Sequence, residues 1–206
     1  MSDADFQVTP ITDGGDWRFA PIADLYQRAF PASERKPAAF LNDVVARSDY
    51  VLLAASIGED VAGFSVLYVS NAGFGLLEYM AVNERLRGHG VGGKLFCETA
   101  RHCPAPMVLE VEAPGEGANS IEARRVEFYR RLGCRMVPQL CYRMPQLRAE
   151  LPPPMRLMLT NYASDTIGKA QLGDWIGDIY SHVYDRPQPD PAVAEMLFPL
   201  PDYLDL

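Results

Sequence analysis

A glycine-rich segment near the middle of the chain most restricts the folds that this sequence can adopt. Four glycines lie within the six residues Gly88–Gly93, and Lys94 follows them. An apolar run, Leu76–Val82, precedes the segment, and apolar residues at helical intervals follow it. The pattern predicts a strand, a turn and a helix. Glycines in such a turn let backbone N–H groups approach a phosphate closely, and the helix adds the positive end of its dipole.

Two other glycine-rich motifs compete for this segment. A P-loop needs a hydroxyl-bearing residue after Lys94 to hold magnesium, but Leu95 stands there. A dinucleotide-binding turn would find its three glycines here and a ribose-binding acid in Glu112. That turn should follow its strand almost directly and open the domain, whereas the polar spacer Asn83–Arg87 intervenes and several elements precede it. A dinucleotide-binding enzyme is therefore the more distant alternative.

Hydrophobic periodicity predicts an α+β chain in which strands and helices are mixed. The expected strands are Phe6–Ile11, Tyr50–Ile57, Val61–Val69, Leu76–Val82, Met107–Glu112 and Met155–Leu159, with short extended pieces at Cys134–Val137 and Gln139–Arg143. The expected helices are Trp17–Phe30, Ala38–Arg47, one after the glycine turn, Ile121–Leu132 and Ile167–Val183. We expect residues 1–160 to form the main domain and residues 161–206 a helical, proline-rich extension.

The segment that contains the glycine turn resembles the acetyl-CoA motif of the GCN5-related N-acetyltransferase (GNAT) family. The signature is Arg or Gln, two residues, Gly, one residue, and Gly or Ala. Arg87, Gly90 and Gly92 occupy the signature positions, after the strand Leu77–Val82. The resemblance extends from about Phe6 to Leu159.

A second resemblance to the same family lies downstream. Phe128–Cys134 is similar to the helix end that carries an aromatic residue, Tyr, three residues, Gly and usually Phe, with Cys134 in place of the Phe. Glu122 and Arg125 replace the Asn and Ala that the family often has before the Tyr. The contacts assigned to those two positions are therefore not carried over to this chain.

The resemblance implies a GNAT-type fold, α+β, with a mixed, mostly antiparallel central sheet flanked by helices and a helical C-terminal extension. It also implies acetyl-CoA as a co-substrate and no metal. The residues expected to bind acetyl-CoA are Met80, Ala81, Val82, Arg87, Gly88, His89, Gly90, Val91, Gly92, Gly93, Lys94 and Tyr129. Backbone N–H groups near Ala81 or Val82 would stabilise the oxyanion.

The chemistry requires a base, because a primary amine with a pKa of roughly 10.4 is protonated at neutral pH. Glu78 is the first candidate, since residues 78, 80 and 82 share one face of the strand expected to hold the thioester. Glu112 is the second candidate, Glu110 the third, and a water relay remains open. Tyr129 stands where the family places its general acid, which returns a proton to the departing thiolate.

We expect the acceptor to be a small amine-bearing metabolite, although peptides and protein N-termini stay open because one scaffold hosts many acceptors. The competing class is a non-catalytic acyl-CoA-binding module on the same fold. Such a module would keep the glycine turn and lose the acid and the base.

Composition excludes some partners. The net charge of −8 argues against a nucleic-acid partner, because binding of that kind needs a basic surface. No stretch approaches the roughly 20 continuous apolar residues that span a bilayer, so we expect no membrane partner and a cytoplasmic protein. The four cysteines and three histidines lack ligand-like spacing, which predicts buried free thiols. A homodimer is possible.

Overall fold

Two compact units make up the protein. The computed structural model describes residues 6–32, 34–37, 39–103, 106–114, 120–146 and 151–206. The first unit comprises residues 1–69 and 77–104, and the second comprises residues 70–76 and 105–206. Within the described ranges the main sheet has the strand order β1-β2-β3-β4-β5-β7-β6, and β4 contributes its first residues to the second unit and its later residues to the first.

The first unit is an antiparallel meander with three helices. Its strands are β1 (Phe6–Ile11), β2 (Tyr50–Ile57), β3 (Asp60–Ser70) and β4 (Phe74–Val82). Its helices are α1 (Phe19–Ala29), α2 (Phe40–Ala46) and α3 (Val91–His102), with a short 3-10 turn, η2 (Glu84–Leu86), before α3. A tight turn joins β2 and β3 as a hairpin, and Gly58 adopts φ +58° there. The helices predicted at Trp17–Phe30 and Ala38–Arg47 begin two residues later and end one residue earlier than expected.

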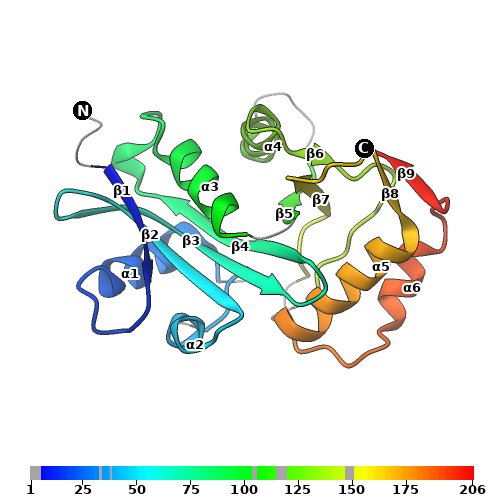
Figure 1. Cartoon of the computed structure of the whole chain (residues 1–206), viewed down its shortest axis with the longest axis horizontal. Coiled ribbons are helices and arrows are strands. Elements are labelled where there is room, and N and C mark those ends of the chain that lie inside the picture. Colours follow the sequence, from blue (N-terminus) through cyan, green and yellow to red (C-terminus); the bar gives the residue numbers. More distant parts are fainter. Residues whose placement is uncertain (1–5, 33, 38, 104–105, 115–119, 147–150) are drawn as a thin grey trace. The chain divides into compact units, whose positions relative to one another are not determined.

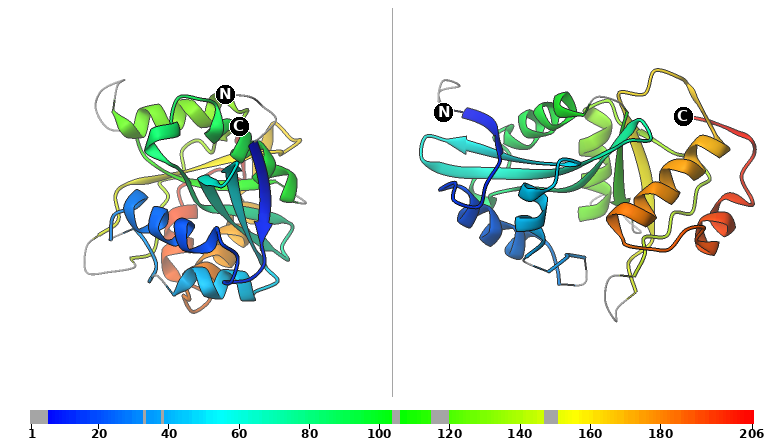
Figure 2. Two further views of the ribbon diagram at one scale, coloured as in Figure 1. Left: turned by 90° about the vertical axis from the view of Figure 1, so that its left-hand side faces the viewer. Right: turned by 60° about the horizontal axis from the view of Figure 1, so that its bottom comes forward.

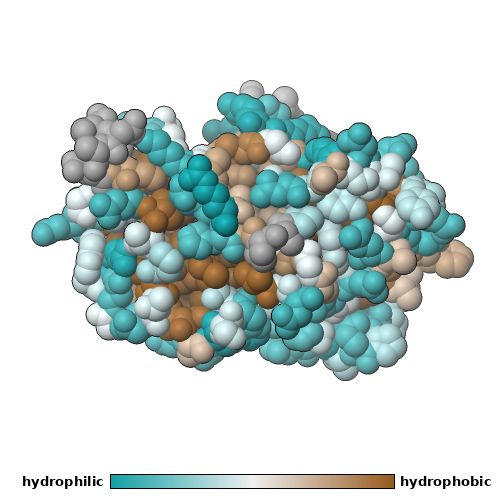
Figure 3. Space-filling model, viewed as in Figure 1, coloured by the Kyte–Doolittle hydropathy of each residue, from teal (hydrophilic) through white to brown (hydrophobic). Residues whose placement is uncertain are grey.

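Alternation along β2 separates the two apolar layers of this unit. Leu53 and Ala55 pack against Val91 and Leu95 of α3. The side chain of Tyr50 lies on the opposite face of the strand. Its ring contacts the ring of Phe40 in α2, with the two centroids 5.9 Å apart. Helices α1 and α2 thus cover one face of the strands and α3 covers the other, as Figures 1 and 2 show. In the face drawn in Figure 3, hydrophilic residues surround an apolar area over β2 to β4.

The second unit contains the closing strands of the sheet and the C-terminal extension. Its sheet strands are β5 (Met107–Glu112), β6 (Arg135–Met136) and β7 (Met155–Thr160), and α4 (Ile121–Arg131) connects β5 with β6. Both β5 and β6 pair antiparallel with β7. The piece predicted at Gln139–Arg143 is not a strand, because Tyr142 makes only a single bridge to Met155.

The extension is helical, as the sequence predicts, and it also contains a pair of short strands. Residues 169–183 of the expected helix Ile167–Val183 form a helix, α5 (Lys169–Asp178), and a π-helical turn, η3 (Ile179–Val183), whereas residues 167–168 belong to a strand, β8 (Thr166–Gly168). Helix α6 (Pro191–Leu197) and strand β9 (Tyr203–Asp205) follow. Strand β8 pairs with β9, so that Ile167 faces Leu204 from 37 positions away. Ile167 is fully buried, and this long-range pairing overrides its local helical pattern.

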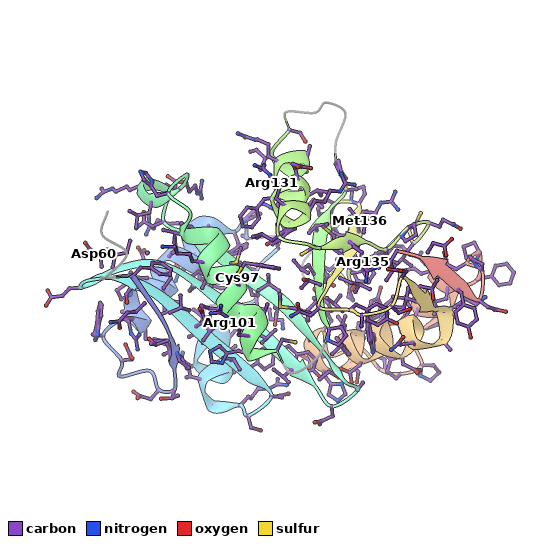
Figure 4. All side chains as sticks on the ribbon, turned by 45° about the horizontal axis from the view of Figure 1, so that its top comes forward. Asp60, Cys97, Arg101, Arg131, Arg135 and Met136 are labelled. Atoms are coloured by element: carbon purple, nitrogen blue, oxygen red, sulfur yellow. The ribbon has the colours of Figure 1, made fainter. Side chains whose placement is uncertain are left out.

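Side-chain contacts attach the extension to the rest of the second unit. The Arg135 guanidinium in β6 donates to the carbonyl oxygens of Tyr162 at 2.5 Å and Ser164 at 2.7 Å. Figure 4 shows Arg135 beside Met136 at this end of the unit. The Tyr180 hydroxyl of η3 donates to the carbonyl oxygen of Arg143. Residues 161–206 are therefore packed onto the strands and are not a loose tail.

The cysteine prediction is partly wrong. All four cysteines are free, but only Cys103 and Cys134 are buried, whereas Cys97 and Cys141 are exposed. Cys97 lies on α3 with Arg101 one turn further along (Figure 4), on the side of the helix away from its apolar face. No helix within the described ranges is long and apolar enough to cross a membrane.

Candidate functional site

The glycine turn has the strand–turn–helix geometry that the sequence predicts. The chain leaves β4 at Val82, passes through η2 and enters α3 at Val91. Gly88 and Gly90 adopt φ values of +81° and +79°, a left-handed region that glycine enters without steric cost. Gly90 is the N-cap of α3 and makes no side-chain cap. The first N–H groups of this helix therefore point to the turn without a capping side chain, as an anion site requires.

Basic side chains surround this turn. Arg87 is exposed and lies 3.6 Å from Glu84, in a surface pair that contributes little to stability. His89 is exposed, and its Nδ1 lies 3.0 Å from the Arg87 carbonyl oxygen. The ammonium of Lys94 lies 5.3 Å from the centre of the Phe6 ring, one turn into α3. The rim therefore carries positive charge next to the positive end of the helix dipole.

The end of β4 is held closely against β3. Met80 and Val82 pack against the apolar cluster that includes α3. On β3, a Cβ atom at Gly63 would lie 2.6 Å from the Ala81 carbonyl oxygen, which is closer than real contacts allow. Only glycine at position 63 therefore lets the backbone of Ala81 and Val82 take its observed position. A glycine inside a predicted strand is the signal for such a close approach, and the sequence analysis did not use it.

Glu78 forms a buried ion pair with Lys36. The Lys36 ammonium lies 2.6 Å from Glu78 Oε1, and the two side chains are 14% and 3% exposed. The same ammonium lies 4.4 Å from the centre of the Phe40 ring, a cation–π arrangement. Burial raises the pKa of Glu78, and the charge of Lys36 opposes that rise.

The carboxylate of Glu78 has hydrogen-bonding capacity that its neighbours use poorly. Within the described part of the chain, neither Glu78 oxygen nor the Tyr50 hydroxyl makes a hydrogen bond of regular geometry. Burial, followed by the charge of Glu78, raises the pKa of Tyr50. Arg47 adds a weaker favourable charge to the carboxylate and is itself bound to Asp49 at 2.6 Å. Buried polar atoms of this kind are uncommon in folded proteins and often mark functional sites.

Two phenols fix the segment that carries Lys36. The Tyr26 hydroxyl of α1 donates to the Lys36 carbonyl oxygen at 3.2 Å. The Tyr79 hydroxyl of β4 donates to the Glu34 carbonyl oxygen at 3.2 Å and accepts from the Lys36 N–H at 3.3 Å. The rings of Tyr26 and Tyr79 meet edge to face with centroids 4.9 Å apart. The position of Lys36 is therefore determined by the packing of α1 against β4.

In the second unit, Glu112 is an ion-paired carboxylate near the surface. Its Oε1 accepts a hydrogen bond from Arg125 Nη1 at 2.7 Å, and the two side chains are 19% and 43% exposed. Arg125 is one of the two α4 residues that depart from the family pattern. This departure therefore gives the second candidate base an ion-pair partner.

Glu110 is bound by two phenols. The Tyr142 hydroxyl donates to Oε1, and the Tyr184 hydroxyl, which belongs to the extension, donates to Oε2 at 2.5 Å. Burial and the Glu110 charge raise the pKa of Tyr142 well above its ordinary value, so this phenol stays a donor. These contacts make Glu110 an attachment point for the extension.

Tyr129 is buried in the last turns of α4. Burial raises the pKa of its phenol to about 12, and Arg125 opposes this rise. Helix α4 ends at a left-handed glycine, since Gly133 adopts φ +84° and its N–H donates to the Arg130 carbonyl oxygen at 2.9 Å. The Cys134 N–H bonds to the Tyr129 carbonyl oxygen at 3.0 Å, which fixes the backbone of the tyrosine.

The predicted residues fall into two groups. The first unit holds the glycine turn, the β4 residues Met80–Val82 and Glu78, and the second unit holds Tyr129, Glu110 and Glu112. Sequence reasoning missed Lys36, which lies 42 positions from its partner. No group of three His, Cys, Asp or Glu side chains in the described ranges could hold a metal ion.

Comparisons with known proteins agree with this geometry. The acetyltransferase (GNAT) family model matches residues 19–134. A GNAT-family protein from Bacteroides thetaiotaomicron has a TM-score of 0.74 and 23% identity, over 88% of this chain and 99% of its own. An aminoglycoside 6'-N-acetyltransferase complexed with coenzyme A has a TM-score of 0.60 and 14% identity, over 75% and 96%.

A plant protein gives a similar match. Arabidopsis thaliana NAA60 in complex with acetyl-CoA has a TM-score of 0.59 and 18% identity, over 75% of this chain and 97% of its own. Comparison of the sequence with curated proteins finds no significant match. At these identities the solved structures establish the fold, which is the mixed, mostly antiparallel sheet with flanking helices that the sequence predicts.

Proposed function

Because the chain belongs to the acetyltransferase (GNAT) family, whose model matches residues 19–134, we propose that it transfers an acetyl group from acetyl-CoA to a primary amine of a small molecule. Residues 1–160 form the transferase domain in this proposal, and residues 161–206 form an extension attached to it. The observation that carries the proposal is the left-handed glycine turn that opens α3 directly after β4.

The turn fits the pyrophosphate of acetyl-CoA. Gly88 and Gly90 leave backbone N–H groups accessible, and the α3 N-terminus has no capping side chain. Arg87, His89 and Lys94 supply a basic rim for the phosphates. Residues 80–82, whose backbone is held against β3, would receive the thioester carbonyl through an N–H group. Val91, Gly92 and Gly93 complete the binding segment as the first turn of α3.

The chemistry converts a thioester and an amine into an amide and a thiol. Glu78 removes a proton from the acceptor ammonium in this proposal, and burial supports that role because a carboxylate with a raised pKa is a stronger base. Tyr129 returns a proton to the departing thiolate, which its phenol can do because it stays protonated at neutral pH. Glu112, which pairs with Arg125 near the surface, is the second candidate for the base.

The acceptor class rests on the segment that carries Lys36. Residues 34–37 are tied to α1 and β4 by the hydrogen bonds of Tyr26 and Tyr79 and end at Pro37, so they offer a defined surface. Such rigidity suits a small amine better than a variable peptide. Neighbours with the same fold include both classes, since Arabidopsis thaliana Naa50 is solved with a bisubstrate analogue that contains a peptide, with a TM-score of 0.56 and 15% identity.

Calorimetric titration with acetyl-CoA tests the cofactor part of the proposal, with NAD and ATP as parallel ligands. Wild-type protein should bind acetyl-CoA saturably and neither nucleotide. Gly90→Ala should lose affinity by about 5–30-fold, because a Cβ at φ +79° strains the turn by about 1–2 kcal/mol. Gly73→Ala is the matched control, since Gly73 has φ +81° in an unrelated turn. Equal losses in both variants, or binding of NAD alone, would contradict the proposal.

A further inference from the structure

The pairing of Glu78 with Lys36 has consequences for the proposed reaction. Lys36 is the only side chain for which the structure shows an ion pair with Glu78 among the described residues. A carboxylate that is 3% exposed would bind a proton and become neutral if no cation lay beside it. The ammonium at 2.6 Å therefore opposes the rise in the Glu78 pKa that burial causes.

The ammonium is held in place from three sides. The Phe40 ring lies under it with its centre 4.4 Å away, and the backbone of Lys36 is fixed by the phenols of Tyr26 and Tyr79. A long, flexible side chain normally loses entropy when it forms an ion pair, which is why exposed pairs contribute little. Here burial and the fixed backbone reduce that loss.

Every charged or titratable group shown to act on Glu78 comes from this one neighbourhood. Lys36 precedes α2, Arg47 follows it, and Tyr50 begins β2. The phenols of Tyr26 in α1 and Tyr79 in β4 sense the Glu78 charge in turn. Arg47 is engaged with Asp49, and the phenols are neutral, so Lys36 is the group that sets the charge state of the carboxylate.

The second oxygen of Glu78 is not engaged by Lys36. Lys36 approaches Oε1, while Oε2 and the Tyr50 hydroxyl lack a regular hydrogen bond within the described residues. A carboxylate can accept about four hydrogen bonds. Acceptor capacity therefore remains on this buried carboxylate while Lys36 is bound, and Tyr50 is its other polar neighbour.

We propose that Lys36 is a positioning residue, whose ammonium keeps the Glu78 carboxylate ionised and oriented so that Glu78 can take a proton from the acceptor amine. This inference rests on the proposed function of Glu78 as the base. Proton transfer then leaves Glu78 neutral beside Lys36, and the neutral amine forms the new C–N bond while the C–S bond breaks. Lys36 itself neither gains nor loses a proton.

Titration of the Glu78 carboxyl tests the inference in the whole protein without any acceptor. Protein labelled with ¹³C in the glutamate carboxyl groups is titrated by NMR, and Glu78→Gln identifies the resonance by its loss. Lys36→Met should raise the pKa of Glu78 by about 1–3 pH units, the usual effect of removing an adjacent opposite charge. Lys36→Arg should leave the pKa near the wild-type value.

Arg35→Met is the matched control for charge. Arg35 neighbours Lys36 in the chain, but its guanidinium donates to the Gln27 carbonyl oxygen at 2.9 Å and makes no contact shown with Glu78. This variant removes the same charge from the same segment and should leave the Glu78 pKa unchanged. An equal shift in Arg35→Met and Lys36→Met, or none in Lys36→Met, would overturn the inference.

Kinetics then separate positioning from simple structural support. The profile of kcat/KM against pH is measured with an aminoglycoside, a polyamine and a pentapeptide as amine probes. Its acidic limb should move to higher pH in Lys36→Met by the same amount as the Glu78 pKa, and Lys36→Arg should restore it. If the acidic limb of an active Lys36→Met variant stays at the wild-type pH, the inference about Lys36 is wrong and the proposed function still stands. Failure of the wild-type protein to acetylate any probe would instead sink the proposed function.

Discussion

Replacing Lys36 by Met should make the stability of the protein depend on pH through Glu78. The substitution keeps the length of the side chain and removes the ammonium that lies 2.6 Å from Oε1. Breaking a buried ion pair by removing one partner costs about 3–5 kcal/mol, because the other charge is left without compensation. Glu78 can lower that cost by binding a proton, so the full cost appears only where the carboxylate would otherwise be ionised.

The direction follows from the sign of the Glu78 shift. Burial places the folded-state pKa of Glu78 above the unfolded value of about 4.3. The contribution of this group to stability is thus fully present below pH about 4.3 and is lost as the pH rises through the folded-state pKa. Without Lys36 the folded-state pKa is higher still, so the loss continues to higher pH. In this window the free energy of unfolding of the variant should decrease relative to the wild type by up to about 1.4 kcal/mol per pH unit.

Urea denaturation followed by circular dichroism measures the effect at pH 5, 6, 7 and 8. We expect the deficit of Lys36→Met to be about 2–4 kcal/mol larger at pH 8 than at pH 5. The double variant with Glu78→Gln should lose this pH dependence and recover stability, because a neutral amide of similar shape needs no cation. Arg35→Met should parallel the wild type. A constant deficit for Lys36→Met across the pH range would refute a buried, charge-compensated Glu78.

Three further substitutions test other parts of the structure. Tyr129→Phe should lower kcat by about 10²–10⁴-fold, the range for a general acid, with the Kd for acetyl-CoA unchanged; an unchanged kcat would remove Tyr129 from the reaction. Gly63→Ala should lower the free energy of unfolding by about 1–3 kcal/mol, measured by denaturation, and weaken acetyl-CoA binding, measured by calorimetry. Both effects are expected because its Cβ would lie 2.6 Å from the Ala81 carbonyl oxygen. Normal binding would show that the backbone of Ala81 can move freely. Tyr184→Phe removes the donor 2.5 Å from Glu110 Oε2 and should lower the free energy of unfolding by about 1–3 kcal/mol in urea; an unchanged midpoint would mean that this bond does not hold the extension.

Local patterns were sufficient for much of the fold. The bounds of β1 and β2 are those that the sequence predicts, and the left-handed glycines at 88 and 90 lie in the predicted glycine turn. These features depend on neighbours within a few positions in the chain, which a sequence shows directly.

Features that depend on distant residues were not predictable in the same way. The β8–β9 pair joins Ile167 to Leu204, so a segment with helical periodicity begins as a strand. The Lys36–Glu78 pair likewise joins a loop to a strand, and nothing in the spacing of either residue marks it. Gly63 differs, because an isolated glycine inside an apolar strand is a local signal of close backbone approach.

Acetyl transfer to a small amine is the property to measure most directly. Purified protein is incubated with acetyl-CoA and a mixture of primary amines, including aminoglycosides and polyamines, and with a pentapeptide in parallel. A thiol reagent follows the release of CoA, and mass spectrometry identifies the acetylated product. We predict an acetylated small amine whose formation requires the protein and falls strongly in Tyr129→Phe. Saturable binding of acetyl-CoA with no acetylated product from any amine would contradict transfer and favour an acyl-CoA-binding module on the same fold.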